Sequence, residues 1–123
     1  MPKENIILSM SFDFALEVIK KCKPLQENRE YILSKQLIRS GTSVGANIRE
    51  AQNAVSKKDF IHKLSISQKE CDESIYWIEL LYQAEYLNNQ DYFSLKKEAE
   101  SLLKILKSII ITTRQNMKTA IHH

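Results

Sequence analysis

Only one pair of residues in this chain has the types and spacing of a metal-binding motif. Asp59 and His62 lie three positions apart, which places both side chains on one face of a helix, as in one half of a carboxylate-bundle iron site. A complete site needs a second such pair and two further glutamates. The other histidines are the terminal His122 and His123. The sequence therefore predicts no metal site, no catalytic residue and no cofactor, and a protein that is not an enzyme.

Both glycines of the chain lie in residues 39–47, RSGTSVGAN, a composition typical of a loop. The spacing of a phosphate-binding loop, G-x-x-x-x-G-K-[ST], is absent. Small and apolar residues instead recur through the stretch at steps of four and three, as on one face of a helix. These residues are Leu37, Gly41, Val44, Ile48, Ala51 and Val55. We therefore predict a helix that runs through both glycines, at a cost of about 2 kcal/mol that close packing must offset.

The remaining chemistry-bearing residues are two isolated cysteines, Cys22 and Cys71. Without a Cys-x-x-Cys motif or a neighbouring histidine, they are typical of buried, reduced thiols. The N-terminal residues MPKENIILSM are too short and too mixed for a secretory signal, and no apolar run approaches the roughly 18 residues that cross a membrane. We expect a cytoplasmic protein with no membrane contact.

The elements that must position these residues are helices. The 123 residues contain two Gly and two Pro, too few turn residues for an all-β protein, and 43% are hydrophobic. Breaks are expected at Pro24, at the helix-capping Ser56 and at Asn88–Asn89. They predict helices over residues 5–22, 28–54, 57–87 and 90–117. Short connections favour an all-α, antiparallel up-down-up-down four-helix bundle, a single domain over residues 1–123.

The predicted core follows from apolar residues three and four positions apart. The first helix offers Leu8, Phe12, Ala15, Leu16, Ile19 and Cys22. The third offers Phe60, Leu64, Cys71, Ile75, Ile78 and Tyr82. The fourth offers Leu95, Ala99, Leu102, Leu106, Ile109 and Thr113.

Residues 75–87, IYWIELLYQAEYL, carry more apolar surface than one face of a helix can use. A helix that is apolar on nearly all sides is buried on nearly all sides, so we predict that other copies of the chain cover this one. The expected interface residues are Tyr76, Trp77, Leu80 and Leu81. An aromatic cluster of this kind could instead bind a ligand or stack on nucleic acid.

A second row on the glycine-containing helix is polar, and it consists of Gln36, Ser40, Ser43 and Asn47. The row has the same spacing of four, three and four residues. It is either solvated surface or a close helix contact, within the bundle or between subunits. We include it among the candidate interface residues.

Charge is sorted along the chain although the net charge is only +3. Residues 29–69 carry eight basic and three acidic side chains, residues 70–100 two basic and eight acidic, and residues 101–123 four basic and none acidic. Antiparallel threading gathers the basic segments at one end of the bundle, the basic pole. Its candidate nucleic-acid contacts are Arg49, Lys57, Lys58, Lys63, Arg114 and Lys118. The alternative is an ordinary solvated end.

Three segments of the sequence resemble a known bacterial family. They are QLIRSGTSVGANIREA at residues 36–51, SKKDFIHKL at residues 56–64 and YWIELL at residues 76–81. The family is called four helix bundle protein, and some members are encoded in intervening sequences of large-subunit ribosomal RNA genes. Many members have Ala-Glu-Gly where this chain has Arg49-Glu50-Ala51.

The resemblance implies a four-helix bundle assembled as a homopentamer, with no catalytic residue. It also implies kinship with the accessory protein of diversity-generating retroelements, a basic pentamer that binds reverse transcriptase and nucleic acid. Two hypotheses follow. The first is an oligomeric protein that binds RNA or DNA through the basic pole, and the alternative is a scaffold or accessory subunit that binds a protein partner.

Overall fold

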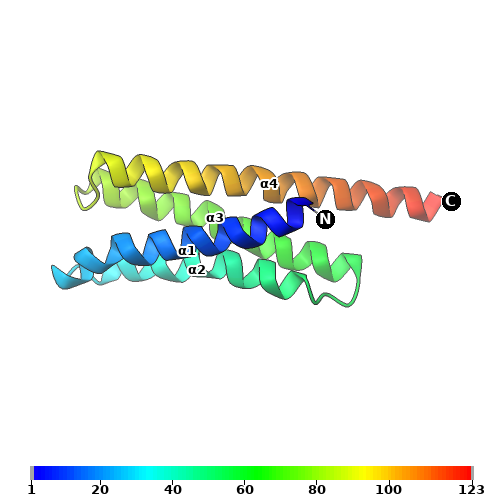
Figure 1. The fold of residues 1–123 in the computed structure, drawn as a ribbon, viewed down its shortest axis with the longest axis horizontal. Helices are drawn as coiled ribbons and strands as arrows, with labels where there is room; N and C mark the ends of the chain where they lie inside the picture. The colour runs from blue at the N-terminus through cyan, green and yellow to red at the C-terminus, as the bar shows by residue number, and fades with distance from the viewer. Residues whose placement is uncertain (1, 123) are drawn as a thin grey trace.

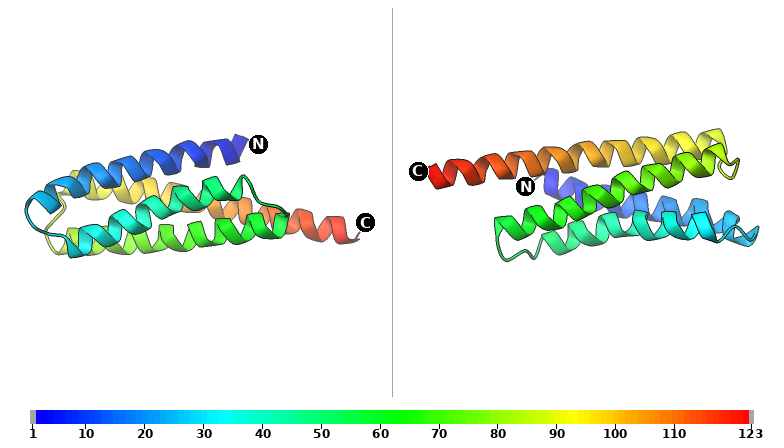
Figure 2. Two further views of the ribbon diagram at one scale, coloured as in Figure 1. Left: turned by 90° about the horizontal axis from the view of Figure 1, so that it is seen from below. Right: turned by 180° about the vertical axis from the view of Figure 1, so that it is seen from behind.

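The chain folds into four helices joined by short loops, shown in Figure 1. The computed structural model describes the backbone of residues 2–122 and the side chains of residues 6–119. The helices are α1 (Pro2–Glu27), α2 (Ile32–Ala51), α3 (Lys57–Gln83) and α4 (Asn89–His122). Both α1 and α3 pack against α2 and α4, and each helix runs antiparallel to the next (Figures 1 and 2). The predicted up-down-up-down four-helix bundle is confirmed. Within the described range, no helix is long and apolar enough to cross a membrane.

The helix α2 passes through both glycines without a break, as the spacing predicted. Leu37, Val44 and Ile48 on this helix are fully buried in the core. A Cβ atom placed on Gly41 would lie 3.1 Å from Val18 Cγ2, and one placed on Gly45 would lie 3.2 Å from Ser11 Oγ. Both contacts are tighter than ordinary carbon packing, so the glycines let α1 approach α2 closely.

The buried face of α1 differs from the predicted one. The predicted stripe contained Phe12, Leu16 and Ile19, but these side chains are 59%, 40% and 43% exposed. The helix buries a different row, which consists of Ile7, Ser11, Phe14, Val18, Cys22 and Leu25. This row brings the side chains that fit the two glycines of α2 onto the interface, which explains why it wins over an equally apolar neighbour.

The predicted break at Pro24 is also wrong, because α1 continues to Glu27. Proline removes one helical hydrogen bond, since it has no backbone N–H to donate. One further turn buries Leu25, which is 7% exposed, and this burial compensates the loss. The helix ends where Arg29 takes a positive φ of 67° and the Glu30 N–H donates to the Leu25 carbonyl at 2.8 Å.

Side-chain caps set the starts of the middle helices. The Glu30 carboxylate accepts the N–H groups of Leu33 and Ser34 at 2.8 and 2.9 Å, so α2 begins at residue 32 rather than 28. At the other end α2 stops at Ala51, and Val55 lies in the loop, 93% exposed. The predicted cap of α3 is confirmed, because Ser56 Oγ accepts the Asp59 N–H at 3.0 Å.

The last two helices end differently from the predicted boundaries. The α3 helix stops at Gln83, four residues early, because Glu85 takes a positive φ of 69°. The α4 helix runs on to His122, beyond the predicted residue 117. Five of its six predicted core residues are buried, namely Leu95, Ala99, Leu102, Leu106 and Ile109, whereas Thr113 is half-buried.

Candidate interaction surfaces

The helix ends that carry the predicted basic pole lie together at one end of the molecule. The α2–α3 loop, the start of α1 and the C-terminal part of α4 lie at this end, opposite the loops at residues 28–31 and 84–88 (Figures 1 and 2). The structure therefore brings the six predicted basic residues toward one end from three helices. Among them Arg49, Lys57, Lys58, Arg114 and Lys118 are exposed.

Lys63 differs from the other five basic residues. Its side chain is half-buried and its Nζ lies 3.3 Å from the Glu50 Oε1 atom of α2. This ion pair links α3 to α2 and neutralises part of the charge that the sequence assigned to the pole. Among the residues whose side chains the structure describes, the other five basic residues form no ion pair.

Two of the predicted interface residues are not available to a partner. Leu81 is fully buried in the core of its own chain, because the buried seam of α3 runs through Ser74, Ile78 and Leu81. Ser40 is also fully buried, and its Oγ accepts a hydrogen bond from Ser74 Oγ at 2.9 Å. At Ser40, the polar row of α2 therefore forms a close contact with α3 within the bundle.

The other six candidates of the interface remain at least partly accessible. Tyr76 is 58% exposed, whereas the remaining five are half-buried: Gln36, Ser43, Asn47, Trp77 and Leu80. Asn47 donates its Nδ2 to the carbonyl of Ser43 at 2.8 Å, a contact within its own helix. They divide between two helices that pack against each other, with Gln36, Ser43 and Asn47 on α2 and the other three on α3.

Trp77 belongs to a polar network across the α2–α3 interface. Its Nε1 donates to Glu73 Oε2 at 3.1 Å, and Tyr76 packs edge-on against its ring with centroids 5.0 Å apart. Arg39 of α2 forms an ion pair with Glu73 and another with Glu70 at 2.9 Å. Trp77 therefore has its polar group satisfied inside the chain and presents only part of its ring to solvent.

An accessible apolar face on α1 was missed by the sequence reasoning. Phe12, Leu16 and Ile19, which we name the α1 outer face, point away from the core. A groove of about 800 Å³ lies beside Phe12, between α1 and α2, and Gly45 and Ala46 are among the residues that line it. The signal was present in the sequence, because α1 has two apolar rows and a helix of a small bundle buries only one.

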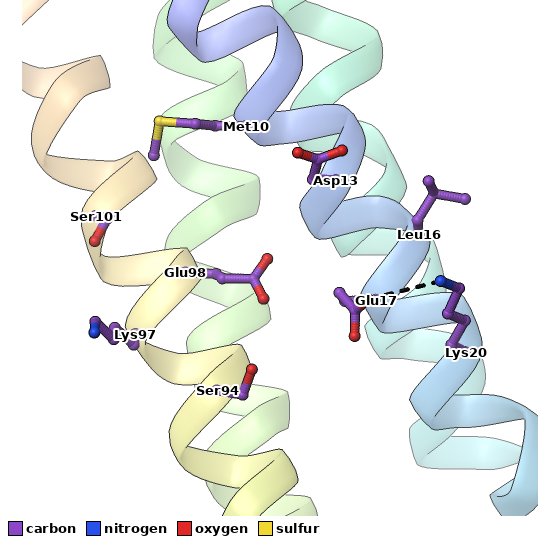
Figure 3. Close-up of a pocket in the computed structure, with 9 residues that line it drawn as sticks. All are labelled: Met10, Asp13, Leu16, Glu17, Lys20, Ser94, Lys97, Glu98 and Ser101. Carbon is purple, nitrogen blue, oxygen red and sulfur yellow. Dashed lines mark ion pairs between the residues drawn. The ribbon is translucent and has the colours of Figure 1, made fainter.

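A second groove, between α1 and α4, is lined by charged side chains and shown in Figure 3. Glu98 points from α4 toward α1, where Asp13 and Glu17 lie, and Lys20 pairs with Glu17 at 3.8 Å. Burial raises the pKa of Glu98, the charges of Glu17 and Asp13 raise it further, and Lys21 opposes them. No set of three or more potential ligands in the described residues could hold a metal ion.

Aromatic side chains gather at the pole opposite the basic one. The rings of Tyr82 and Tyr92 stack with centroids 3.9 Å apart, and Tyr82 donates its hydroxyl to Asn89 Oδ1 at 2.6 Å. Lys96 Nζ lies 3.1 Å from the Tyr92 hydroxyl oxygen, and this hydrogen bond is the main cause of a raised Lys96 pKa. The cluster joins the end of α3 to the start of α4.

The two cysteines of the chain have surroundings that suppress their reactivity, whereas the histidine of α3 does not. Burial raises the pKa of both Cys22 and Cys71 to about 12, so neither is a thiolate near neutral pH. His62 is exposed on α3. The arrangement as a whole offers surfaces for binding, in the form of a basic pole, an apolar helix face and an acidic groove.

Comparisons with known proteins place the chain in a family. No curated protein matches it. A crystal structure of a protein of unknown function from the S23 ribosomal protein family of Bacteroides thetaiotaomicron is 43% identical, with a TM-score of 0.84 over 88% of this chain and 97% of the other. The family model described as 23S rRNA-intervening sequence protein matches residues 3–108. The chain therefore belongs to the 23S rRNA-intervening sequence protein family.

Proposed function

We propose that this protein is a non-enzymatic, self-associating bundle that binds nucleic acid through its basic pole. The observation that carries the proposal is the exposure of Arg49, Lys57, Lys58, Arg114 and Lys118 toward one end of the molecule. Such an end attracts phosphates by a sequence-independent force that weakens with salt. The family description names 23S rRNA, which makes structured ribosomal RNA the first ligand to test.

The position of the charges supports this proposal over a purely stabilising role. Lys57 and Lys58 occupy the first turn of α3, where the helix dipole disfavours positive charge. Each such lysine costs the helix about 0.3–1 kcal/mol at an exposed site. Residues placed against the stability of their own helix are better explained by a ligand.

The test is binding of fluorescently labelled 23S-derived RNA, measured by anisotropy over a range of salt concentrations. We expect the Lys57→Gln/Lys58→Gln variant to bind more weakly, with a salt dependence reduced by about two counterions. The control Lys23→Gln/Lys35→Gln removes the same charge from exposed positions near the opposite pole. Unchanged binding by the first variant, or an equal loss in the control, would overturn the role of the pole.

We propose that the chain associates as a ring of five copies, the number that the family resemblance implies, and the exposed α1 outer face supports association itself. Monomeric proteins seldom expose several large apolar side chains along one helix face, and such faces mark interfaces. A ring requires two different patches on each copy. We propose the α1 outer face as the first patch and the surface around Tyr76 and Trp77 as the second.

Light scattering of the purified protein tests the assembly. We expect the mass of five chains, and a smaller particle of unchanged helicity for Phe12→Ser/Ile19→Ser and for Tyr76→Ser. Val55→Ser changes a loop side chain that is 93% exposed and should leave the mass unaltered. A single-chain mass for the unmodified protein would reject self-association.

A scaffold that binds a protein partner is the second candidate function, and the α1 outer face favours it as well. A cytoplasmic location, where thiols stay reduced, suits either function, since Cys22 and Cys71 are free. Affinity capture after nuclease treatment separates the two. One stoichiometric protein, lost in Phe12→Ser/Ile19→Ser and retained in Lys57→Gln/Lys58→Gln, would support the scaffold.

A further inference from the structure

A row of four basic side chains, interrupted by one isoleucine, runs along α4 and extends well beyond the pole itself. Every member lies three or four positions from the next and is exposed, so the row occupies one outward face of the helix. The row, which we name the α4 stripe, consists of Lys104, Lys107, Ile111, Arg114 and Lys118. At 1.5 Å per residue it is about 21 Å long.

The cations of the α4 stripe join no two helices through an ion pair within the part of the chain whose side chains are described. Neither Lys104 nor Lys107, nor the two basic residues beyond them, makes a hydrogen bond or ion pair with the described residues. Other cations hold helices together, as Lys21 does with Asp91 at 3.1 Å and Arg39 with Glu70 at 2.9 Å. Glu100 lies one turn before Lys104 on the same helix face, and no acidic residue follows it in the chain, so no carboxylate of α4 lies between the cations of the stripe or beyond them.

The outer part of α4 is accessible from several sides. The helix projects past the α2–α3 loop (Figures 1 and 2). Thr113 and Asn116 still line a shallow hollow with Ser56 and Lys57, and α4 continues to His122 beyond it. The family match ends at residue 108, so the distal half of the stripe lies outside the matched region.

We infer that the α4 stripe binds the phosphate backbone of a double helix, with α4 lying along the duplex. This inference rests on the proposed nucleic-acid binding. It specifies that the nucleic acid is a duplex, and it adds two contact residues outside the predicted pole, Lys104 and Lys107. The stripe lies on one continuous helix, which holds its charges at a regular spacing and suits the regularly spaced phosphates of a duplex. It has no aromatic side chain, whereas single-strand sites stack bases on aromatic rings.

The two sources of a duplex backbone, RNA and DNA, are distinguished by the probes. Anisotropy is measured with a labelled RNA duplex, a DNA duplex of the same sequence and one of the single strands, each about 20 nucleotides long. We expect both duplexes to bind more tightly than the single strand. A preference between the duplexes identifies the natural ligand, because only RNA offers 2′-hydroxyls. Tighter binding of the single strand would overturn the duplex assignment.

The variant Lys104→Gln/Lys107→Gln tests the stripe itself. We expect its duplex affinity to fall about 10-fold near 0.1 M salt, with a salt dependence reduced by about two counterions. Its control is Lys23→Gln/Lys97→Gln, which removes equal charge and includes an exposed lysine of α4 outside the stripe. An equal loss in this control would overturn the inference, and circular dichroism confirms that each variant is folded.

The outcome also separates this inference from the proposed function. If Lys57→Gln/Lys58→Gln weakens binding and Lys104→Gln/Lys107→Gln does not, the pole binds nucleic acid end-on and the stripe is rejected. If the unmodified protein binds none of the three probes at low salt, the proposed function fails together with the inference. Loss in the stripe variant alone supports lengthwise docking.

Discussion

Gly41 of α2 lies so close to Val18 of α1 that a methyl group at position 41 would come within 3.1 and 3.2 Å of the two Val18 methyls. One helical turn later, Gly45 has the same relationship to Ser11, at 3.2 Å from its hydroxyl oxygen. Carbon atoms pack best at about 3.5–4.0 Å. The distance between α1 and α2 is therefore set by the absence of side chains at these two positions.

The first prediction concerns this contact. Gly41→Ala should destabilise the fold by about 1 kcal/mol, because the clash with a stiff, fully buried valine exceeds the helix-propensity gain of alanine. In a Val18→Ala background the same change should instead stabilise by about 1 kcal/mol. Urea unfolding of the four proteins gives the coupling directly. An equal effect of Gly41→Ala in both backgrounds would contradict the assigned contact.

The second prediction concerns the two residues with positive φ, Arg29 and Glu85, at 67° and 69°. Each follows a helix end that is closed by a backbone hydrogen bond of 2.8 Å, from Glu30 to Leu25 and from Tyr86 to Leu81. Left-handed backbone costs a residue with a side chain about 1–2 kcal/mol, and glycine avoids most of that cost. Arg29→Gly and Glu85→Gly should each stabilise the protein by about 1 kcal/mol in urea unfolding.

A matched control places glycine at an ordinary helical position. Glu79 is exposed on α3, so Glu79→Gly removes the same side chain as Glu85→Gly from right-handed backbone. It should cost about 1 kcal/mol. Loss of stability in both glutamate variants would mean that the turn after α3 does not hold the conformation described.

The third prediction concerns the thiols. Burial is the main cause that raises the pKa of Cys22 and Cys71 to about 12, with Glu30 and Asp72 adding to it. Native protein should leave both unmodified by a disulfide reagent at pH 8, and two thiols per chain should react in urea. Because only unfolded thiols ionise between pH 9.0 and about 12, the free energy of unfolding should fall as the pH rises through that window. Rapid reaction of a native thiol would show that its helix opens locally.

The sequence was sufficient for features that depend on a single unambiguous pattern. The helix through Gly41 was predictable because its register continues on both sides of the glycine. The buried face of α1 was not predictable, because Phe12 and Phe14 belong to two neighbouring rows that are equally apolar. What decides between them is the fit of Ser11 and Val18 to the glycines of α2, a property of two helices together.

The candidate surfaces divide in the same way. Clustering of Lys57 and Arg114 at one end followed from charge counts and antiparallel threading alone. The pairing of Lys63 with Glu50 depends on side-chain positions across two helices, and the burial of Leu81 depends on which face α3 turns to the core. The α4 stripe was readable in the predicted helix over residues 90–117 as far as Arg114, and the structure adds the turn that carries Lys118.

The last prediction concerns pH and the groove between α1 and α4. Glu98 has a pKa raised first by burial and then by Glu17 and Asp13, so its ionised form destabilises the fold. This contribution is fully present above the raised pKa and is relieved as the pH falls toward the ordinary value of 4.5. Glu98→Gln should therefore stabilise the protein at pH 7, by a few tenths of a kcal/mol because solvent screens the group. The gain should vanish near pH 4.5.

Urea unfolding at both pH values measures this effect, and Glu100→Gln is the control, since Glu100 is exposed on the same helix two residues away. The control removes the same charge without relieving the groove, so its effect on the free energy of unfolding should lack the pH dependence of Glu98→Gln. If Glu98→Gln gave an equal gain at pH 7 and pH 4.5, the benefit would come from the amide and not from lost charge. The three carboxylates would then not repel one another across the groove.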